Sequence, residues 1–310
     1  MSVIAHAFLV ALVVSLSASE DPFVLGFLRQ FGFLEAESDL LSPCSVVDVA
    51  AAVRAAQMEM GLPATGLVDN DTLALMRSQR CGVSPGFPSG PGRVRRYALM
   101  GSRWRLTPVT LLIDEYHPDL PRSKVDIAVD AVLAAVSAMS QVKFSRLTSP
   151  ALTPDIRVSF VDSDHGCVRT LQDPAMAHAF PPRFGGDVHL WKQVNWTRTR
   201  LDRVFAHELL HALGLDHSSD STALMYAYYR DPPPGSPFLA DDDVRALQRL
   251  YGVPSYFRIA GECVPRCAFV LCCVARRHLI SLGWQVWPVT ALCSGARRDW
   301  NSRGTQSRFG

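Results

Sequence analysis

The chain has 310 residues, of which 48% are hydrophobic and 19% charged, and its formal net charge is +2. Such a composition predicts a folded chain, with a length that suits about two domains, and the near-neutral charge excludes a nucleic-acid-binding surface. Outside the N-terminus there is no run of about 20 uncharged apolar residues, which excludes a multi-spanning membrane protein. Eight cysteines are too few for a small fold built from disulfides.

The first residues predict export from the cell. An apolar run from Val3 to Leu16 is followed by the small residues Ser17-Ala18-Ser19 and then by acidic residues. This run is too short to span a bilayer, and the order is typical of a signal peptide, which we assign to residues 1–19. The alternative interpretation is a buried N-terminal helix. Export predicts a secreted protein of the extracellular space or matrix.

Residues 20–96 are expected to form a small helical bundle followed by a linker. Apolar residues recur at intervals of three and four within 22–34, 45–61 and 70–78. A bundle of about 60 residues is marginal unless it docks on something larger. The Gly/Pro/Ser stretch 84–92 then leads into Arg93-Val94-Arg95-Arg96. This order predicts cleavage between Arg96 and Tyr97 by a furin-like convertase, the alternative being a solvated charge patch.

Residues 97–252 have the pattern of an α+β domain. The segments 109–116 and 154–162 are dense in β-branched residues and predict strands. Between them, 124–142 predicts a long amphipathic helix. A second helix is expected to begin near Leu201, and a third lies within 240–252, where acidic residues occupy the first turn as the helix dipole favours.

The chemistry of the chain is concentrated in the segment HELLHALGLDH, residues 207–217. Residues four apart share a helix face, so His207 and His211 can direct their rings at one metal ion. Gly214 can adopt the positive φ that ends a helix and lets His217 return as a third ligand. Three protein nitrogens leave one position open on a tetrahedral zinc, as in catalytic sites. Glu208 is then expected to be the general base. The alternative is a core helix whose histidines have no function, but it does not explain why the three histidines, Glu208 and Gly214 have this spacing.

The motif resembles HExxHxxGxxH of the metzincins, and Ser218 after the third histidine is typical of the matrix metalloproteinases, or matrixins. Ala223 to Tyr226 is similar to the family's Met-turn, which implies that Met225 lies beneath the zinc. The resemblance covers residues 22–252. It implies a metzincin zinc-peptidase domain, with a twisted mixed sheet and three helices, preceded by a small helical propeptide bundle.

The same resemblance implies a function. It predicts a secreted zinc metalloendopeptidase that cuts extracellular matrix or other extracellular proteins before a bulky hydrophobic P1′ residue. Its expected partners are these protein substrates, a furin-like convertase and protein inhibitors of the tissue-inhibitor type, with no nucleic acid and no transmembrane span.

Upstream, Arg80-Cys81-Gly82-Val83 matches the cysteine-switch motif PRCGVPD, but Gln79 replaces the first proline and Ser84-Pro85 replaces Pro-Asp. The resemblance implies that Cys81 ligates the zinc in a latent form. The alternative is a free or disulfide-linked cysteine. Because the family's aspartate is missing, Arg80 is expected to lack its usual partner and latency to be leaky.

The new N-terminus that cleavage would create also has an expected partner. After cleavage at residues 96–97, the resemblance implies that the ammonium of Tyr97 pairs with Asp242 on the last helix. An exposed pair of this kind contributes little, typically under about 1 kcal/mol.

A second, structural zinc is implied by the same family. His165, His178 and His189 stand at the positions of its three histidine ligands, and Cys167 replaces the fourth ligand, an aspartate. A thiolate is a good zinc ligand, so a site of three histidines and one cysteine is one interpretation. The other is that Cys167 forms a disulfide and the site is weak or empty.

Calcium binding is expected to be weaker than usual or partly lost. The family's glycine-rich calcium loop is shortened here, and Leu190-Trp191 stand where acidic residues usually follow. Calcium needs six to eight oxygens, and only Asp173, Asp187 and backbone carbonyls remain as candidates.

Residues 253–310 fall outside the resemblance and do not lead into a hemopexin-like propeller. They contain five cysteines and two apolar stretches, which Arg276-Arg277-His278 separate. This interruption argues against a membrane span. The tail is interpreted either as a small disulfide-linked module or as a non-native tail from an alternative transcript.

Two rival functions follow from these departures. One is a catalytically silent zinc-binding module that acts through its propeptide or its tail. The intact Glu208 argues against it, because a silent module needs no general base. The other is an active peptidase with a role outside the matrix, such as processing hormones or shed ectodomains.

Overall fold

The computed structural model describes residues 21–34, 46–84, 99–167 and 170–254. The chain divides into two compact units, residues 1–258 and 259–310, and the described residues all lie in the first. The predicted signal peptide at 1–19, the cleavage site at Arg96–Tyr97 and nearly all of the tail from 253 lie outside the described residues. Within these ranges, no helix is both long and apolar enough to cross a bilayer.

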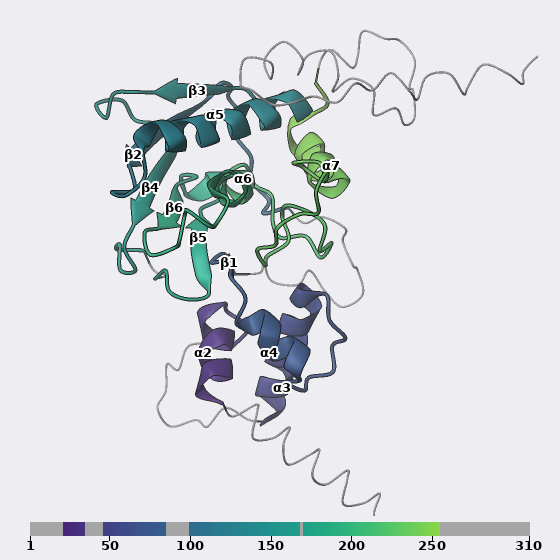
Figure 1. Cartoon of the computed structure of the whole chain (residues 1–310). Helices are drawn as coiled ribbons and strands as arrows, with labels where there is room; N and C mark the ends of the chain where they lie inside the picture. Colours follow the sequence, from purple (N-terminus) through teal and green to yellow (C-terminus); the bar gives the residue numbers. More distant parts are fainter. Residues whose placement is uncertain (1–20, 35–45, 85–98, 168–169, 255–310) are drawn as a thin grey trace, which may run out of the picture. The chain divides into compact units, whose positions relative to one another are not determined.

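Three helices near the N-terminus confirm the predicted bundle: α2 (Pro22–Gln30), α3 (Val46–Met60) and α4 (Asn70–Met76) (Figure 1). Asp21 and Asp69 cap α2 and α4, each accepting a backbone N–H of the first turn with its carboxylate. The buried side chains of the bundle form one cluster with side chains from residues 161–228. The bundle therefore completes its core against the domain that follows it.

The sheet has six strands: β1 (Arg80–Cys81), β2 (Val109–Glu115), β3 (Phe144–Leu147), β4 (Ile156–Val161), β5 (Ala175–Ala179) and β6 (Val188–Trp191). Their order is β1-β5-β6-β4-β2-β3, and all neighbours are parallel except β5 and β6. The sheet is therefore mixed, as expected. Strands β2 and β4 confirm the predicted segments, whereas β3, β5 and β6 are too short to carry an alternating pattern of their own.

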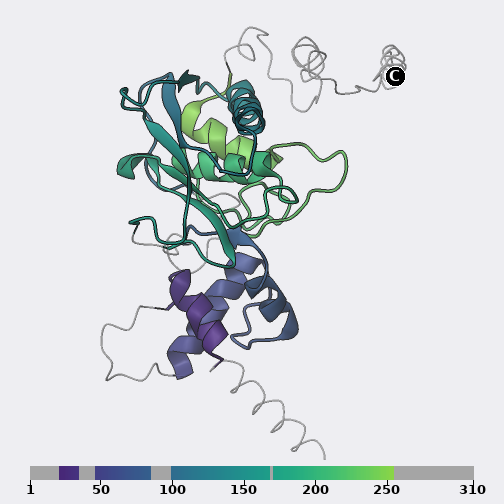
Figure 2. The ribbon, with the colours of Figure 1, turned by 60° about the vertical axis from the view of Figure 1, so that its left-hand side comes forward.

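Three longer helices complete the domain: α5 (Arg122–Met139), α6 (Leu201–Ala212) and α7 (Asp241–Tyr251). All three confirm predicted helices. Helix α5 buries Val125, Val129, Val132 and Val136, which recur at intervals of three and four. Helices α5 and α6 pack against each other on one side of the sheet, and α6 also packs on β5 and β6 (Figure 2). The core lies in this layer between helices and sheet.

A sharp turn follows α6 and reverses the chain. Gly214 has a φ of 101°, a conformation that glycine adopts without strain. A side chain at this position would also clash with the backbone oxygen of Ser102. The turn confirms the expectation for Gly214 and carries the chain back towards α6, where His217 joins the other two histidines.

Candidate metal centre

Four predicted ligands come together beside α6. Cys81, His207, His211 and His217 are buried, and their ligand atoms lie within 4.8 Å of one another. Two of the histidines come from one face of α6, one from the turn after it, and the cysteine from β1. The spacing within residues 207–217 thus predicted three members of the group, the resemblance of residues 80–83 to the switch motif predicted the fourth, and the fold brings all four together.

Each histidine is oriented by an acceptor at its Nδ1 atom. For His207 this acceptor is the carbonyl of Leu224, at 2.7 Å, and for His211 it is the carbonyl of Leu215, at 2.8 Å. Because a carbonyl only accepts, Nδ1 must carry the proton and Nε2 must offer its lone pair. The Nε2 atoms of His207 and His217 are buried without a hydrogen-bond partner. Unpartnered buried nitrogens beside a cysteine are the donor set that suits zinc.

The ionisation of these side chains fits a cation at the centre. Burial lowers the pKa of His207 to about 4, so its ring is neutral near pH 7 and free to ligate. Burial also raises the pKa of the Cys81 thiol well above its ordinary value. A thiolate at this position therefore needs a positive partner, which a metal ion provides. The Sγ atom of Cys81 lies 3.5 Å from the Nε2 atom of His211.

Glu208 lies beside the first histidine and faces the same interior. Its side chain is buried, and one carboxylate oxygen, Oε2, has no hydrogen-bond partner. Burial raises its pKa to about 8 in the absence of a metal ion. A carboxyl group with a raised pKa in a closed site is suited to accept and return a proton.

Residues 79–82 occupy a groove between the edge of the sheet and the segment 227–229. On one side, Arg80 and Gly82 donate their backbone N–H groups to the carbonyls of Pro174 and Ala177 along β5. On the other side, Cys81 donates to the carbonyl of Ala227 at 2.9 Å. The segment is thus held as an added strand on both sides, the way an extended peptide is recognised at a sheet edge.

Arg80 has an acidic partner from outside the switch motif. The family's aspartate is missing, as the sequence showed, but the guanidinium forms an ion pair with Glu59 on α3, at 3.1 Å. It also donates to the hydroxyl of Tyr228 and lies 3.9 Å from the ring centroid of Phe31. The side chain is 0% exposed, and a buried cation requires such partners. The sequence did not predict this partner, because Glu59 is distant in sequence and no motif links it to Arg80; leaky latency stays a prediction.

The second predicted group also comes together. His165, His178 and His189 lie with Cys167 so that the four ligand atoms are within 4.8 Å of one another. The Nε2 atoms of His165 and His178 are 2.9 Å apart, and the sulfur of Cys167 is 3.4 Å from Nδ1 of His189. Cys167 is a free cysteine. Among the described residues, this geometry favours a metal ligand over a disulfide.

The candidate calcium residues do not form such a group. Among the described residues, neither of the two clusters with metal-ligand geometry contains Asp173 or Asp187. Asp173 is exposed, whereas Asp187 accepts the backbone N–H of Arg157 with a carboxylate oxygen. Calcium binding through these residues stays a prediction.

The Met-turn lies where α7 begins. Met225 is buried. The backbone N–H groups of Leu224 and Met225 both donate to the carboxylate of Asp243. The neighbouring Asp242, which was expected to pair with Tyr97, is buried and accepts the hydroxyl of Ser218. Tyr97 lies outside the described residues, so that pairing stays a prediction.

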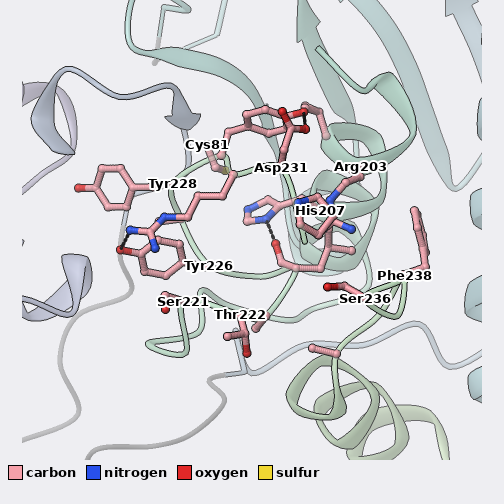
Figure 3. Close-up of a pocket in the computed structure, with 18 of the residues that line it drawn as sticks. Cys81, Arg203, His207, Ser221, Thr222, Tyr226, Tyr228, Asp231, Ser236 and Phe238 are labelled. Carbon is pink, nitrogen blue, oxygen red and sulfur yellow. Dashed lines mark hydrogen bonds between the residues drawn. The ribbon is translucent and has the colours of Figure 1, made fainter. Parts of the chain in front are cut away.

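A cavity of about 680 Å³ opens beside the metal ligands. Cys81 and His207 face it, Tyr226 and Tyr228 line one side, and Arg203 and Phe238 line the other (Figure 3). Burial lowers the pKa of Arg203. The sequence-based prediction missed Glu59, Tyr228 and Arg203, whose roles depend on contacts between distant segments.

Comparison with known protein families assigns both parts of the described chain. Residues 103–252 match the matrixin family, and residues 27–76 match the family described as a putative peptidoglycan binding domain. The first match includes α6 and both histidine groups. The second spans most of the helical bundle.

Curated relatives cover the same regions. The chain is 38% identical to stromelysin-1 of Mus musculus over 210 residues, which is 64% of this chain and 42% of that protein. It is 34% identical to matrix metalloproteinase-27 of Homo sapiens over 283 residues, 85% of this chain and 53% of that protein. The chain thus spans about half the length of the curated relatives it matches. With its metal-binding motif, its mixed sheet and these similarities, the chain contains a matrixin domain at residues 103–252.

Proposed function

We propose that this protein is a zinc-dependent endopeptidase that is made as a latent zymogen and secreted. The observation that carries the proposal is the buried group of three histidines whose ligand atoms converge on one centre, next to Glu208, which has a buried carboxylate oxygen without a hydrogen-bond partner. A silent binding module would need no such carboxylate. The matrixin domain supports the same reaction class.

The chain would bind a substrate peptide in the groove that residues 79–82 now fill. The carbonyls of Pro174 and Ala177 on one side and of Ala227 on the other face this groove and accept backbone N–H groups. An extended peptide can satisfy the same acceptors. The peptide bond to be cut would then lie between the histidines and Glu208.

Zinc held by His207, His211 and His217 would lower the pKa of a water molecule and polarise the peptide carbonyl. Glu208 would accept the proton of that water and later deliver it to the leaving amine. Burial of Glu208 supports this role, because a raised pKa makes its carboxylate a stronger base than an ordinary glutamate. The carbonyl acceptors at Nδ1 would keep the lone pairs of His207 and His211 aimed at the centre.

Latency would come from Cys81, which occupies the fourth position of the group and holds residues 79–82 in the substrate groove. Cleavage between Arg96 and Tyr97 by a furin-like convertase would free this segment. Since these two residues lie outside the described ranges, the support for this step is their basic sequence alone.

Two further features of the proposal concern specificity and the second metal. The cavity beside Glu208 would take the P1′ side chain of an extracellular protein substrate. Its apolar walls suit a bulky side chain, with Arg203 and Phe238 at one end. His165, Cys167, His178 and His189 would hold a structural zinc ion. Inhibition by tissue-inhibitor-type proteins follows from the family and remains part of the proposal.

Hydrolysis of a quenched peptide with leucine at P1′ tests the proposal. The samples are the full-length protein, the protein treated with furin, and furin-treated Glu208→Ala, each with and without a zinc chelator. We expect activity only after furin treatment, with its loss in the Glu208→Ala variant and with chelator. Correctly cleaved, zinc-loaded protein that cuts none of several peptides would instead favour the silent module.

A further inference from the structure

Glu59 makes two contacts that the proposed function leaves unexplained. It lies near the end of α3, in the bundle that cleavage would remove, and its side chain is only 8% exposed. One carboxylate oxygen, Oε2, is 3.1 Å from the Nη2 atom of Arg80. The other, Oε1, accepts a hydrogen bond from the same Nη2 atom at 3.3 Å and is 3.0 Å from the Nδ1 atom of His217. The carboxylate of Glu59 thus contacts both Arg80, the neighbour of Cys81, and His217, one of the candidate metal ligands.

The contact with Arg80 holds the switch segment. The Arg80 guanidinium also donates to the Tyr228 hydroxyl and to the carbonyl of Cys81, but both of these partners are neutral. Within the described ranges, Glu59 is the acidic side chain in contact with this cation. Removing one member of a buried pair leaves the other charge uncompensated, which strongly favours rearrangement. Without Glu59, Arg80 would move towards water and pull Cys81 with it.

The contact with His217 differs from those of the other two histidines. His207 and His211 donate Nδ1–H to carbonyls of their own domain, whereas His217 faces a carboxylate from the bundle. An acceptor at this atom fixes the ring and raises its basicity as a ligand. The third histidine therefore changes its Nδ1 partner when the bundle leaves.

On the basis of the proposed latency, we propose that Glu59 is a positioning residue of the zymogen. Its carboxylate contacts both Arg80 and His217 and so holds the Arg80–Cys81 segment beside His217. Glu59 takes the place of the aspartate that ends the family's switch motif and that is missing after Val83 in this chain. Because Glu59 belongs to the segment that is removed, it acts on the latent form alone. Its loss should release Cys81 and leave the mature enzyme unchanged.

The test follows the exposure of Cys81 in the full-length zymogen. Wild type and Glu59→Gln are treated with iodoacetamide, and the labelling rate of the Cys81 peptide is measured by mass spectrometry. Zinc content is measured in the same samples. Two control variants change other residues of the same bundle. Asp71→Asn removes an exposed carboxylate on α4, and Asp69→Ala removes the N-cap of that helix without changing a contact of residues 79–82.

We expect Cys81 of Glu59→Gln to be labelled about tenfold faster or more than that of wild type, because a buried cation is left unpaired. Zinc should remain bound, both controls should behave like wild type, and enzyme matured from Glu59→Gln should match the wild-type kcat/KM. Peptide hydrolysis before furin treatment should rise in parallel with labelling.

Three results would overturn the inference. They are equal labelling of Glu59→Gln and wild type, equally fast labelling of Asp69→Ala, and loss of zinc from Glu59→Gln at neutral pH. The second would mean that loosening the bundle anywhere releases the switch. A different result, wild-type Cys81 labelled as fast as a free thiol, would contradict the proposed latency itself.

Discussion

The three histidines of the metal centre owe their orientation to residues that are not ligands. His207 and His211 are fixed by backbone carbonyls, and His217 by the carboxylate of Glu59. Each contact leaves the Nε2 lone pair directed inward. These contacts fix the ring orientations of the candidate ligands.

At the second metal group, the identity of one residue decides the ligand set. Cys167 lies within ligand distance of three histidines, and a carboxylate is an equally suitable zinc ligand. We expect Cys167→Ser to lower the zinc content per chain by about half and Cys167→Asp to retain it. Metal analysis after dialysis at neutral pH measures both. Full zinc content in Cys167→Ser would mean that another side chain is the fourth ligand.

At the scale of elements, α7 holds both ends of the region around α6. At its start, the carboxylate of Asp243 accepts the backbone N–H groups of Leu224, Met225 and Ala240. At its end, the hydroxyl of Tyr251 donates to the carbonyl of Leu213, directly after α6. The helix thus positions the Met-turn and the turn at Gly214 together.

Asp243→Asn is expected to loosen the Met-turn. The amide NH2 group would replace one of the two accepting carboxylate oxygens, leaving at least one buried backbone N–H donor without a partner. Such a loss costs about 2 kcal/mol or more of the free energy of unfolding. Denaturation in urea measures the change. The neighbouring Asp241→Asn is the control, since its side chain is 98% exposed, and equal destabilisation by both variants would contradict the explanation.

The burial of Tyr251 predicts a loss of stability at high pH. Burial raises the pKa of Tyr251 to about 12, compared with an ordinary value of 10.0. Between these pH values the unfolded chain has lost the phenolic proton while the folded protein keeps it, so the free energy of unfolding falls as the pH rises. Denaturation at pH 9, 10 and 11 should show this fall, and Tyr251→Phe should show a smaller one. An identical pH dependence in both proteins would rule out this contribution.

At the scale of the whole molecule, the helical bundle and the catalytic domain share a core. Side chains of α2, α3 and α4 pack in one cluster with Val161, Leu171 and Tyr226 of the later domain. The hydroxyl of Tyr226 also donates to the carbonyl of Met60, at the end of α3. The bundle therefore depends on the surface that it covers.

This dependence predicts that residues 21–84 do not fold stably when isolated. A segment of this size buries too little apolar surface by itself. Circular dichroism of the isolated segment should show weak helicity without a cooperative thermal transition, whereas the full-length protein should unfold cooperatively. A sharp transition of the isolated segment would mean that its core is self-sufficient.

The sequence by itself predicted the chemistry and determined most of the elements. The spacing of His207, His211 and His217 around Gly214 is local, so helix periodicity and one glycine were enough to predict three ligands and the general base. The long amphipathic helices were equally readable. The apolar residues that recur along these helices are the residues that pack in the core, so the pattern predicted the helices correctly.

Only the tertiary structure decided which distant residues complete the site. Strands β5 and β6 are short, and their pairing depends on neighbours rather than on their own pattern. The partnership of Glu59 with Arg80 and His217 joins positions far apart in sequence, and no local signal marks it. Burial creates the need for that partnership, because a cation removed from water must find its counter-charge wherever the fold supplies one.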